Sequence, residues 1–138
     1  MSETFLMKLR ELQPSQLFIN SEKLSEVMKA IGPSRRGDFQ PIPVKKIGDG
    51  VVITDGHTRA FAAHLAALEE APVFWDEDDL DWEAYEICVE WCRQEGVLTV
   101  ADLKDRVVGP EEYEILWLKR CEGMQQGLRS RRERSQSE

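Results

Sequence analysis

The stretch that decides the fold is Val51-Val52-Ile53-Thr54-Asp55-Gly56-His57-Thr58-Arg59-Ala60. Its first half is β-branched and apolar, a composition typical of a strand. The second half enters an alanine-rich segment in which Phe61, Leu65 and Leu68 share one helical face, and this predicts a helix over residues 57–68. The sequence therefore predicts a strand that turns directly into a helix.

Such a turn favours the binding of an anion. The first backbone N–H groups of a helix have no partner within the helix, and they carry the positive end of its dipole. Gly56 permits close approach of a ligand to the backbone, and the guanidinium of Arg59 fits phosphate oxygens. His57 and Thr58 add donors, and His57 is expected to share the positive charge with Arg59. We therefore expect a phosphate site formed by Gly56, His57, Thr58 and Arg59.

Asp55 does not fit a simple phosphate site, because a carboxylate repels a phosphate. It is explained if it caps the helix, binds Mg²⁺, or accepts a proton from an attacking hydroxyl. The competing interpretation is that Asp55 and Thr58 only cap a helix while His57 and Arg59 are ordinary surface residues. The short pattern alone leaves both interpretations open.

The other expected elements give an α+β order, with mixed strands and helices followed by helices only. Three segments are expected: a core over residues 1–80, a helical subdomain over 81–124 and a polar, Arg-rich, mobile tail over 125–138. In chain order we expect a strand at 17–19, a helix at 22–31 capped by Asn20 or Ser21, a hairpin of 41–47 and 51–54 around Gly48-Asp49-Gly50, a strand at 71–75, and helices at 82–95, 99–107 and 110–124.

Bulk composition limits the function. A chain of 138 residues suits one domain, and a net charge of -8 argues against a broad nucleic-acid surface. The opening residues 1–6 lack the basic start of a signal peptide, and no apolar run approaches the roughly 20 residues that cross a bilayer. With three cysteines, we expect a cytoplasmic protein with reduced thiols and no membrane contact.

The hairpin, the box Thr54-Asp55-Gly56-His57-Thr58-Arg59 and the strand Val73-Phe74-Trp75 resemble the ParB/sulfiredoxin fold over roughly residues 10–80. The equivalent box in that fold grips nucleotide phosphates. Sulfiredoxin has a cysteine where this chain has Gly56, so its sulfinic-acid chemistry is not implied. Thr58 also separates His57 from Arg59, unlike the sulfiredoxin box.

Among ParB-like proteins, the box is most similar to that of small stand-alone members related to free-serine kinases. This resemblance implies ATP or ADP with Mg²⁺ as cofactors and a small hydroxyl acceptor such as L-serine. It implies catalysis by Asp55, which also contacts the Mg²⁺, and by a glutamate near the first helix, for which Glu22 is the first choice and Glu26 the second. Arg35 and Arg36 either close over the phosphates or belong to a solvated loop.

The alternative function is a non-catalytic ParB-like nucleotide switch or a DNA-associated factor. A nuclease fits least, because only Asp55 is well placed for a metal. The acidic run 76–79 is expected to be a solvated loop, although it also suits a cation or the amino group of a substrate. Cys88 and Cys92 are expected to be core thiols, and the helical C-terminal half either covers the site, forms a homodimer, or both.

Overall fold

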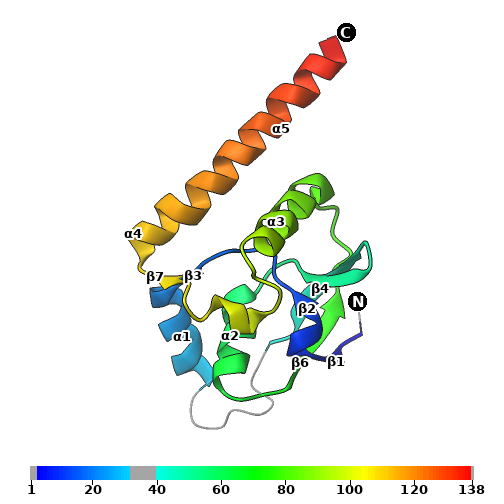
Figure 1. Cartoon of the computed structure of the whole chain (residues 1–138). Helices are drawn as coiled ribbons and strands as arrows, with labels where there is room; N and C mark the ends of the chain where they lie inside the picture. The colour runs from blue at the N-terminus through cyan, green and yellow to red at the C-terminus, as the bar shows by residue number, and fades with distance from the viewer. Residues whose placement is uncertain (1–2, 32–39, 138) are drawn as a thin grey trace.

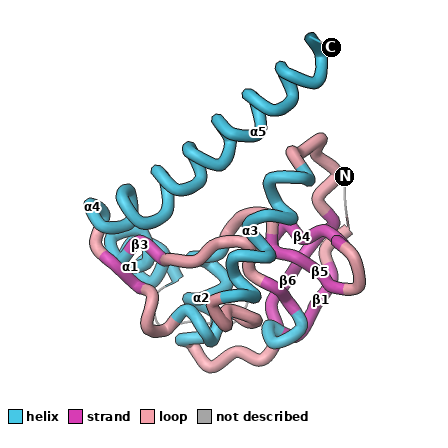
Figure 2. The backbone as a smooth tube through the Cα atoms, turned by 45° about the horizontal axis from the view of Figure 1, so that its top comes forward, coloured by secondary structure: helices cyan, strands magenta, loops and turns pink. Residues whose placement is uncertain are grey.

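The computed structural model describes residues 3–31 and 40–137, and the expected phosphate lid, Arg35 and Arg36, lies outside these ranges. An α+β fold is observed, as expected, with a curled mixed sheet, covering helices and a long C-terminal helix (Figures 1 and 2). Among the described residues, no helix has both the length and the apolar composition needed to span a bilayer.

The larger sheet has the strand order β1-β6-β4-β5-β2. Its centre is the predicted hairpin, an antiparallel pair in which Val44 lies opposite Ile53. β4 also pairs in parallel with β6, where Ile42 lies opposite Val73. The strands are β1 (Phe5–Lys8), β2 (Leu12–Gln13), β4 (Ile42–Ile47), β5 (Gly50–Ile53) and β6 (Glu70–Trp75).

Two helices pack against each other and contribute to the core that this sheet shares. In α1 (Ser21–Ile31), the predicted cap is confirmed, since Asn20 Oδ1 accepts from the amide of Glu22 at 3.0 Å. α2 (His57–Leu65) starts where expected and buries Phe61 together with small alanines, which let the helix approach the sheet closely. It ends three residues earlier than expected, because Ala67 adopts a left-handed conformation with φ of 62°.

The C-terminal half adds α3 (Trp82–Gln94), whose first turn is capped by Asp81. The expected helix at 99–107 is instead a 3₁₀ turn, η2 (Val100–Leu103), followed by β7 (Val107–Val108). β7 pairs in parallel with β3 (Ile19–Asn20), near the other end of the chain. The sequence signal for this pairing was too short to detect, because each strand has two residues.

The last helix is longer than expected. α4 (Pro110–Tyr113), a π-helical turn η3 (Glu114–Leu118) and α5 (Lys119–Ser137) follow one another directly, and Figure 1 shows α5 passing α3 and extending from the core. The expected helix end near Met124 is therefore wrong, because α5 continues to Ser137.

Interactions with α3 explain why α5 remains ordered. Leu128 is buried, and Arg132 donates to Asp81 at 3.0 Å and to Glu83 at 2.8 Å. Arg131 also pairs with Glu83. The buried leucine and the ion pairs attach the polar tail to α3, which the composition of the tail does not indicate.

We expect Arg132→Ala to loosen the C-terminal half of α5, because it removes donors to two carboxylates. Hydrogen exchange followed by mass spectrometry should show faster exchange in residues 128–136. Arg129→Ala is the matched control, since Arg129 is exposed and has no ion pair among the described residues. Equal exchange in the two variants would contradict this role of the ion pairs.

Candidate functional site

The strand-to-helix turn begins at a buried threonine. The amide of Thr54 donates to the carbonyl of Pro43 at 3.0 Å, which extends the β4–β5 pairing by one residue. Its hydroxyl donates to Oδ2 of Asp76 at 2.6 Å. Asp76 is only 7% exposed, and its own amide donates to the carbonyl of Val44. The first residue of the acidic run is therefore a buried structural partner of the turn, contrary to the expected solvated loop.

Gly56 adopts the left-handed conformation, with φ of 78°, that glycine tolerates best. Its amide donates to Oδ1 of Asp55 at 2.8 Å. Within the described part of the chain, no side chain caps α2. The interpretation in which Asp55 and Thr58 cap the helix is therefore wrong. The amides of the first helical turn, His57 to Arg59, have no side-chain partner there, as an anion site requires.

His57 is buried and electrically neutral. Its Nε2 accepts a hydrogen bond from the amide of Ser15 at 2.9 Å, so this nitrogen carries no proton. Burial lowers the pKa of His57 from 6.5 to about 4, and nearby Lys23 lowers it further, although Asp55 opposes the shift. The expectation that His57 supplies positive charge is therefore wrong. Its ring instead attaches the start of α2 to the segment before β3.

Arg59 lies against the turn, as the sequence suggests. Its Nη1 donates to the carbonyl of Pro41 at 2.7 Å, and a Cβ added to Gly56 would lie 3.3 Å from that nitrogen. The guanidinium therefore sits beside the left-handed residue at the helix start. Thr58, by contrast, is buried, so it offers a ligand its backbone amide rather than its hydroxyl.

Two cavities meet at Asp55. One, of about 510 Å³, is acidic and partly aromatic, and it is lined by Pro43, Thr54, Asp55, Phe74, Trp75, Asp76, Glu77, Asp78, Leu80 and Tyr85. The other, of about 220 Å³, lies among the turn, α3 and α5, and His57, Cys88, Trp117 and Cys121 are in its wall. Thr54, Asp55 and Tyr85 line both. Asp55 is exposed, so its carboxylate is accessible to a ligand in either cavity.

Tyr85 is a site residue that the sequence did not reveal. Its hydroxyl donates to the carbonyl of Thr54 at 2.9 Å. Burial raises the pKa of Tyr85, and the carboxylates of Asp55 and Asp76 raise it further. Tyr85 lies within the helix expected at 82–95, and nothing in the sequence indicates that this helix crosses the turn.

Lys23, in the first turn of α1, carries a charge that helps to lower the pKa of His57, but Lys23 lines neither cavity at Asp55. Glu22, the expected second catalytic residue, is exposed at the start of α1 and lines neither cavity that contains Asp55. Its catalytic role remains a prediction.

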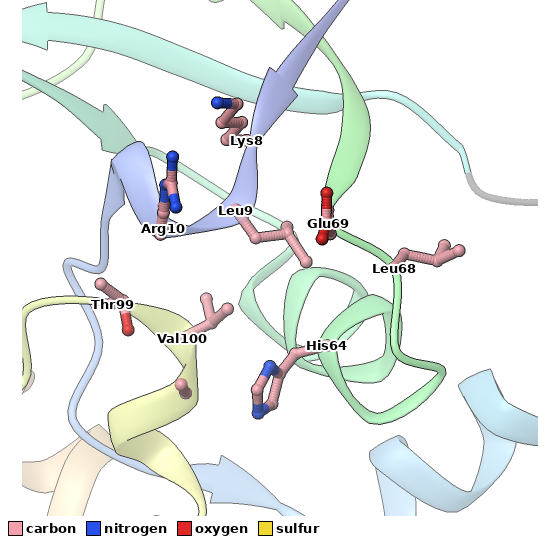
Figure 3. Close-up of a pocket in the computed structure, with 9 residues that line it drawn as sticks. Lys8, Leu9, Arg10, His64, Leu68, Glu69, Thr99 and Val100 are labelled. Atoms are coloured by element: carbon pink, nitrogen blue, oxygen red, sulfur yellow. The ribbon is translucent and has the colours of Figure 1, made fainter.

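A further cavity, of about 260 Å³, lies at the opposite end of α2 and is bordered by Leu9, His64 and Val100. Lys8 and Arg10 are also at its edge. Figure 3 shows the side chains of Lys8 and Arg10 directed away from His64. The basic groups do not converge there, so the cavities at Asp55 are the stronger candidate site.

The metal-binding capacity of the site is limited. Among the described residues, no group of three or more His, Cys, Asp or Glu side chains is arranged to hold a metal ion. Mg²⁺ is commonly held by one or two carboxylates together with substrate phosphates. Asp55 fits that mode, because one of its oxygens accepts from Gly56 and the carboxylate remains exposed.

No protein-family model matches this sequence, and no curated protein sequence is detectably similar to it. Among solved structures, the chain is similar to protein Atu1540 from Agrobacterium tumefaciens, with a TM-score of 0.48, 13% identity, and coverage of 71% of this chain and 51% of that one. It is also similar to a C-terminally truncated chromosome-partitioning protein ParB from Caulobacter crescentus complexed with CTP-gamma-S, with a TM-score of 0.45, 23% identity, and coverage of 67% and 53%.

The chain thus spans about half the length of these two solved proteins. Both TM-scores lie below 0.5, and neither similarity assigns a function to this chain.

We expect the neutral state of His57 to make stability depend on pH. Its pKa in the folded protein, about 4, is below the ordinary value of 6.5, so the unfolded chain binds the proton first as the pH falls. The contribution of His57 is complete above 6.5 and is lost between 6.5 and about 4. Loss of this contribution should lower the free energy of unfolding by about 2 kcal/mol when the pH falls from 7 to 5.

Urea denaturation at the two pH values measures this change. His57→Gln should flatten the pH dependence, whereas His64→Gln, at the other end of α2, should leave it intact. An unchanged slope in His57→Gln would show that other groups cause the pH dependence.

Proposed function

We propose that this protein binds a nucleotide, ATP or ADP, with its phosphates at the first turn of α2. The supporting observation is that this turn has no side-chain cap among the described residues, and that a left-handed glycine precedes it. Three amides at the positive end of a helix dipole suit a phosphate group. Arg59, which lies beside the turn, supplies the positive charge, and the neutral His57 does not.

We further propose that the nucleotide donates a phosphoryl group to a small hydroxyl compound that also carries an amino group, such as L-serine. The acidic cavity supports this choice, because Asp76, Glu77 and Asp78 repel a second anion and attract an ammonium group. A ligand in this cavity also adjoins Asp55. The acceptor hydroxyl and the phosphates would thus lie on either side of one carboxylate.

In the proposed reaction, the acceptor oxygen attacks the terminal phosphorus and the bond to the bridging oxygen breaks. The leaving group is the nucleotide shortened by one phosphate, and Asp55 accepts the hydroxyl proton. Mg²⁺, bound through Asp55 and the phosphates, would neutralise charge on the transferred group. Arg59 has N–H groups beyond the one that binds Pro41 and would orient the phosphates.

A non-catalytic nucleotide switch is the second candidate. The observation that favours it is the position of Glu22, which lines neither cavity at Asp55 and so leaves one carboxylate for catalysis. The two candidates share the phosphate site and differ in turnover. Binding and transfer therefore have to be measured separately.

Nucleotide binding is expected to raise the thermal midpoint with ATP, ADP or CTP in the presence of Mg²⁺. A ligand at 100 times its dissociation constant adds about 2.7 kcal/mol of stability. Gly56→Ala should weaken binding roughly tenfold or more, because it disturbs both the backbone and Arg59 at the phosphates.

The control for this variant is Gly48→Ala. Gly48 also has a positive φ, 61°, and a Cβ there would meet no atom within 4 Å. Both variants should lose about 1–2 kcal/mol of stability through backbone strain, but only Gly56→Ala should lose nucleotide affinity. Equal affinities would place the phosphates elsewhere.

Phosphoryl transfer is expected to depend on Asp55. Asp55→Asn should retain nucleotide binding and reduce turnover about 100-fold or more, because it removes the proton acceptor. Phosphorus NMR with L-serine and ATP or ADP measures the product, and Asp49→Asn in the hairpin turn is the matched control. Binding without any phosphorylated product in the wild-type protein would favour the switch, and full turnover in Asp55→Asn would exclude Asp55 as the base.

A further inference from the structure

Two cysteines from different helices line the smaller cavity beside Asp55. Cys88 belongs to α3 and is buried, whereas Cys121 belongs to α5 and is partly exposed. They are 33 residues apart in the chain. The sequence predicts only that Cys88 and Cys92, on one helix, are core thiols. The structure instead pairs it with a cysteine that no sequence pattern connects to it.

Contacts on both sides of this pair fix the two helices relative to each other. Toward one end, Trp91 of α3 packs edge-on against Trp117, with ring centroids 6.1 Å apart. Toward the other end, Glu83 of α3 pairs with Arg131 and Arg132 of α5. Cys88 lies between Glu83 and Trp91 in α3. Cys121 lies between Trp117 and Arg131 in the C-terminal helical segment. The two segments therefore hold the two thiols opposite each other.

The two thiols also differ chemically in a way that suits oxidation. A hydrogen bond from the Cys88 thiol lowers the pKa of Cys121, and the charge of Arg120 lowers it further, although burial opposes the shift. The same interaction, together with burial, raises the pKa of Cys88. The more accessible sulfur is thus the one that ionises more readily, and the thiolate is the reactive form of cysteine.

The third cysteine provides a contrast. Cys92 is fully buried in the core and does not line the cavity. Burial raises the pKa of its thiol to about 12. A buried thiol of this kind is inert, so the chain contains an internal control for oxidation.

We propose that Cys88 and Cys121 form an intramolecular disulfide, a covalent modification site that links α3 to α5 across the cavity beside Asp55. The oxidant is a two-electron peroxide. A disulfide requires Cα atoms within about 7 Å of each other, so oxidation holds α5 closely against α3. The modification restricts access to the cavity whether or not the protein binds a nucleotide.

The chemistry balances with hydrogen peroxide as the oxidant. The Cys121 thiolate attacks one peroxide oxygen, the O–O bond breaks, and the released hydroxide takes a proton to become water. The resulting sulfenic acid is attacked by the sulfur of Cys88, and its hydroxyl leaves with the thiol proton as a second water. Two thiols are oxidised by two electrons, and one peroxide is reduced to two waters.

The test is to treat the full chain with hydrogen peroxide and count free thiols after denaturation. The count should fall from three to one, and peptide mass spectrometry should find the peptides that contain Cys88 and Cys121 joined. In the Cys92→Ala variant, the two remaining thiols, those of Cys88 and Cys121, should both be lost to the same disulfide. Cys121→Ser, at a partly exposed position, should keep both of its thiols and form no monomeric disulfide.

Three unchanged thiols, a disulfide that includes Cys92, or cross-linking only between two chains would overturn the proposal. The mapping of the wild-type protein decides the matter even if a variant folds poorly. Because the readout is a thiol count, its failure is distinct from failure of the nucleotide site. Addition of dithiothreitol should restore three thiols and thereby separate the disulfide from irreversible oxidation.

Discussion

The hydrogen bond between Thr54 and Asp76 is the interaction on which the site depends. Thr54 follows β5 and Asp76 follows β6, and both strands pair with β4, so the 2.6 Å bond joins the ends of two strands across a third. A buried carboxylate is costly unless hydrogen bonds satisfy it, and Asp76 also accepts from the amide of Asp78. Once these two residues are fixed, the next residues, Asp55 and Gly56, have little freedom in where they begin α2.

Much of the fold around this turn was predictable because its signals are local. The hairpin, the start of α2 and the cap at Asn20 follow from turn residues, β-branching and a short polar side chain, and the structure confirms them. β1 was not predicted, because only alternate residues of Phe5–Lys8 are partly buried and its pairing with β6 joins distant parts of the chain. The length of α5 depends on ion pairs with α3, which composition does not disclose.

Some features of the candidate site could also be predicted from the sequence, and others could not. The position of the strand-to-helix turn and of Asp55 within it could be predicted, since both are consequences of consecutive residues. The state of His57 could not, because its neutrality comes from burial and from the amide of Ser15, 42 residues away. Tyr85 reaches the turn from α3, and no spacing along the sequence indicates such an approach.

The parallel pairing of β3 with β7 has a consequence for how the chain is made. Ile19 and Asn20 lie opposite Val107 and Val108, and the hydrophobic core that receives Ile19 also includes Val100, Leu103 and Trp117. A nascent chain that has emerged only as far as α2 therefore presents an incomplete core with no opposite strand for β3. Because folding during synthesis proceeds from the N-terminus, the core around β3 is complete only after residues 100–117 have been synthesised.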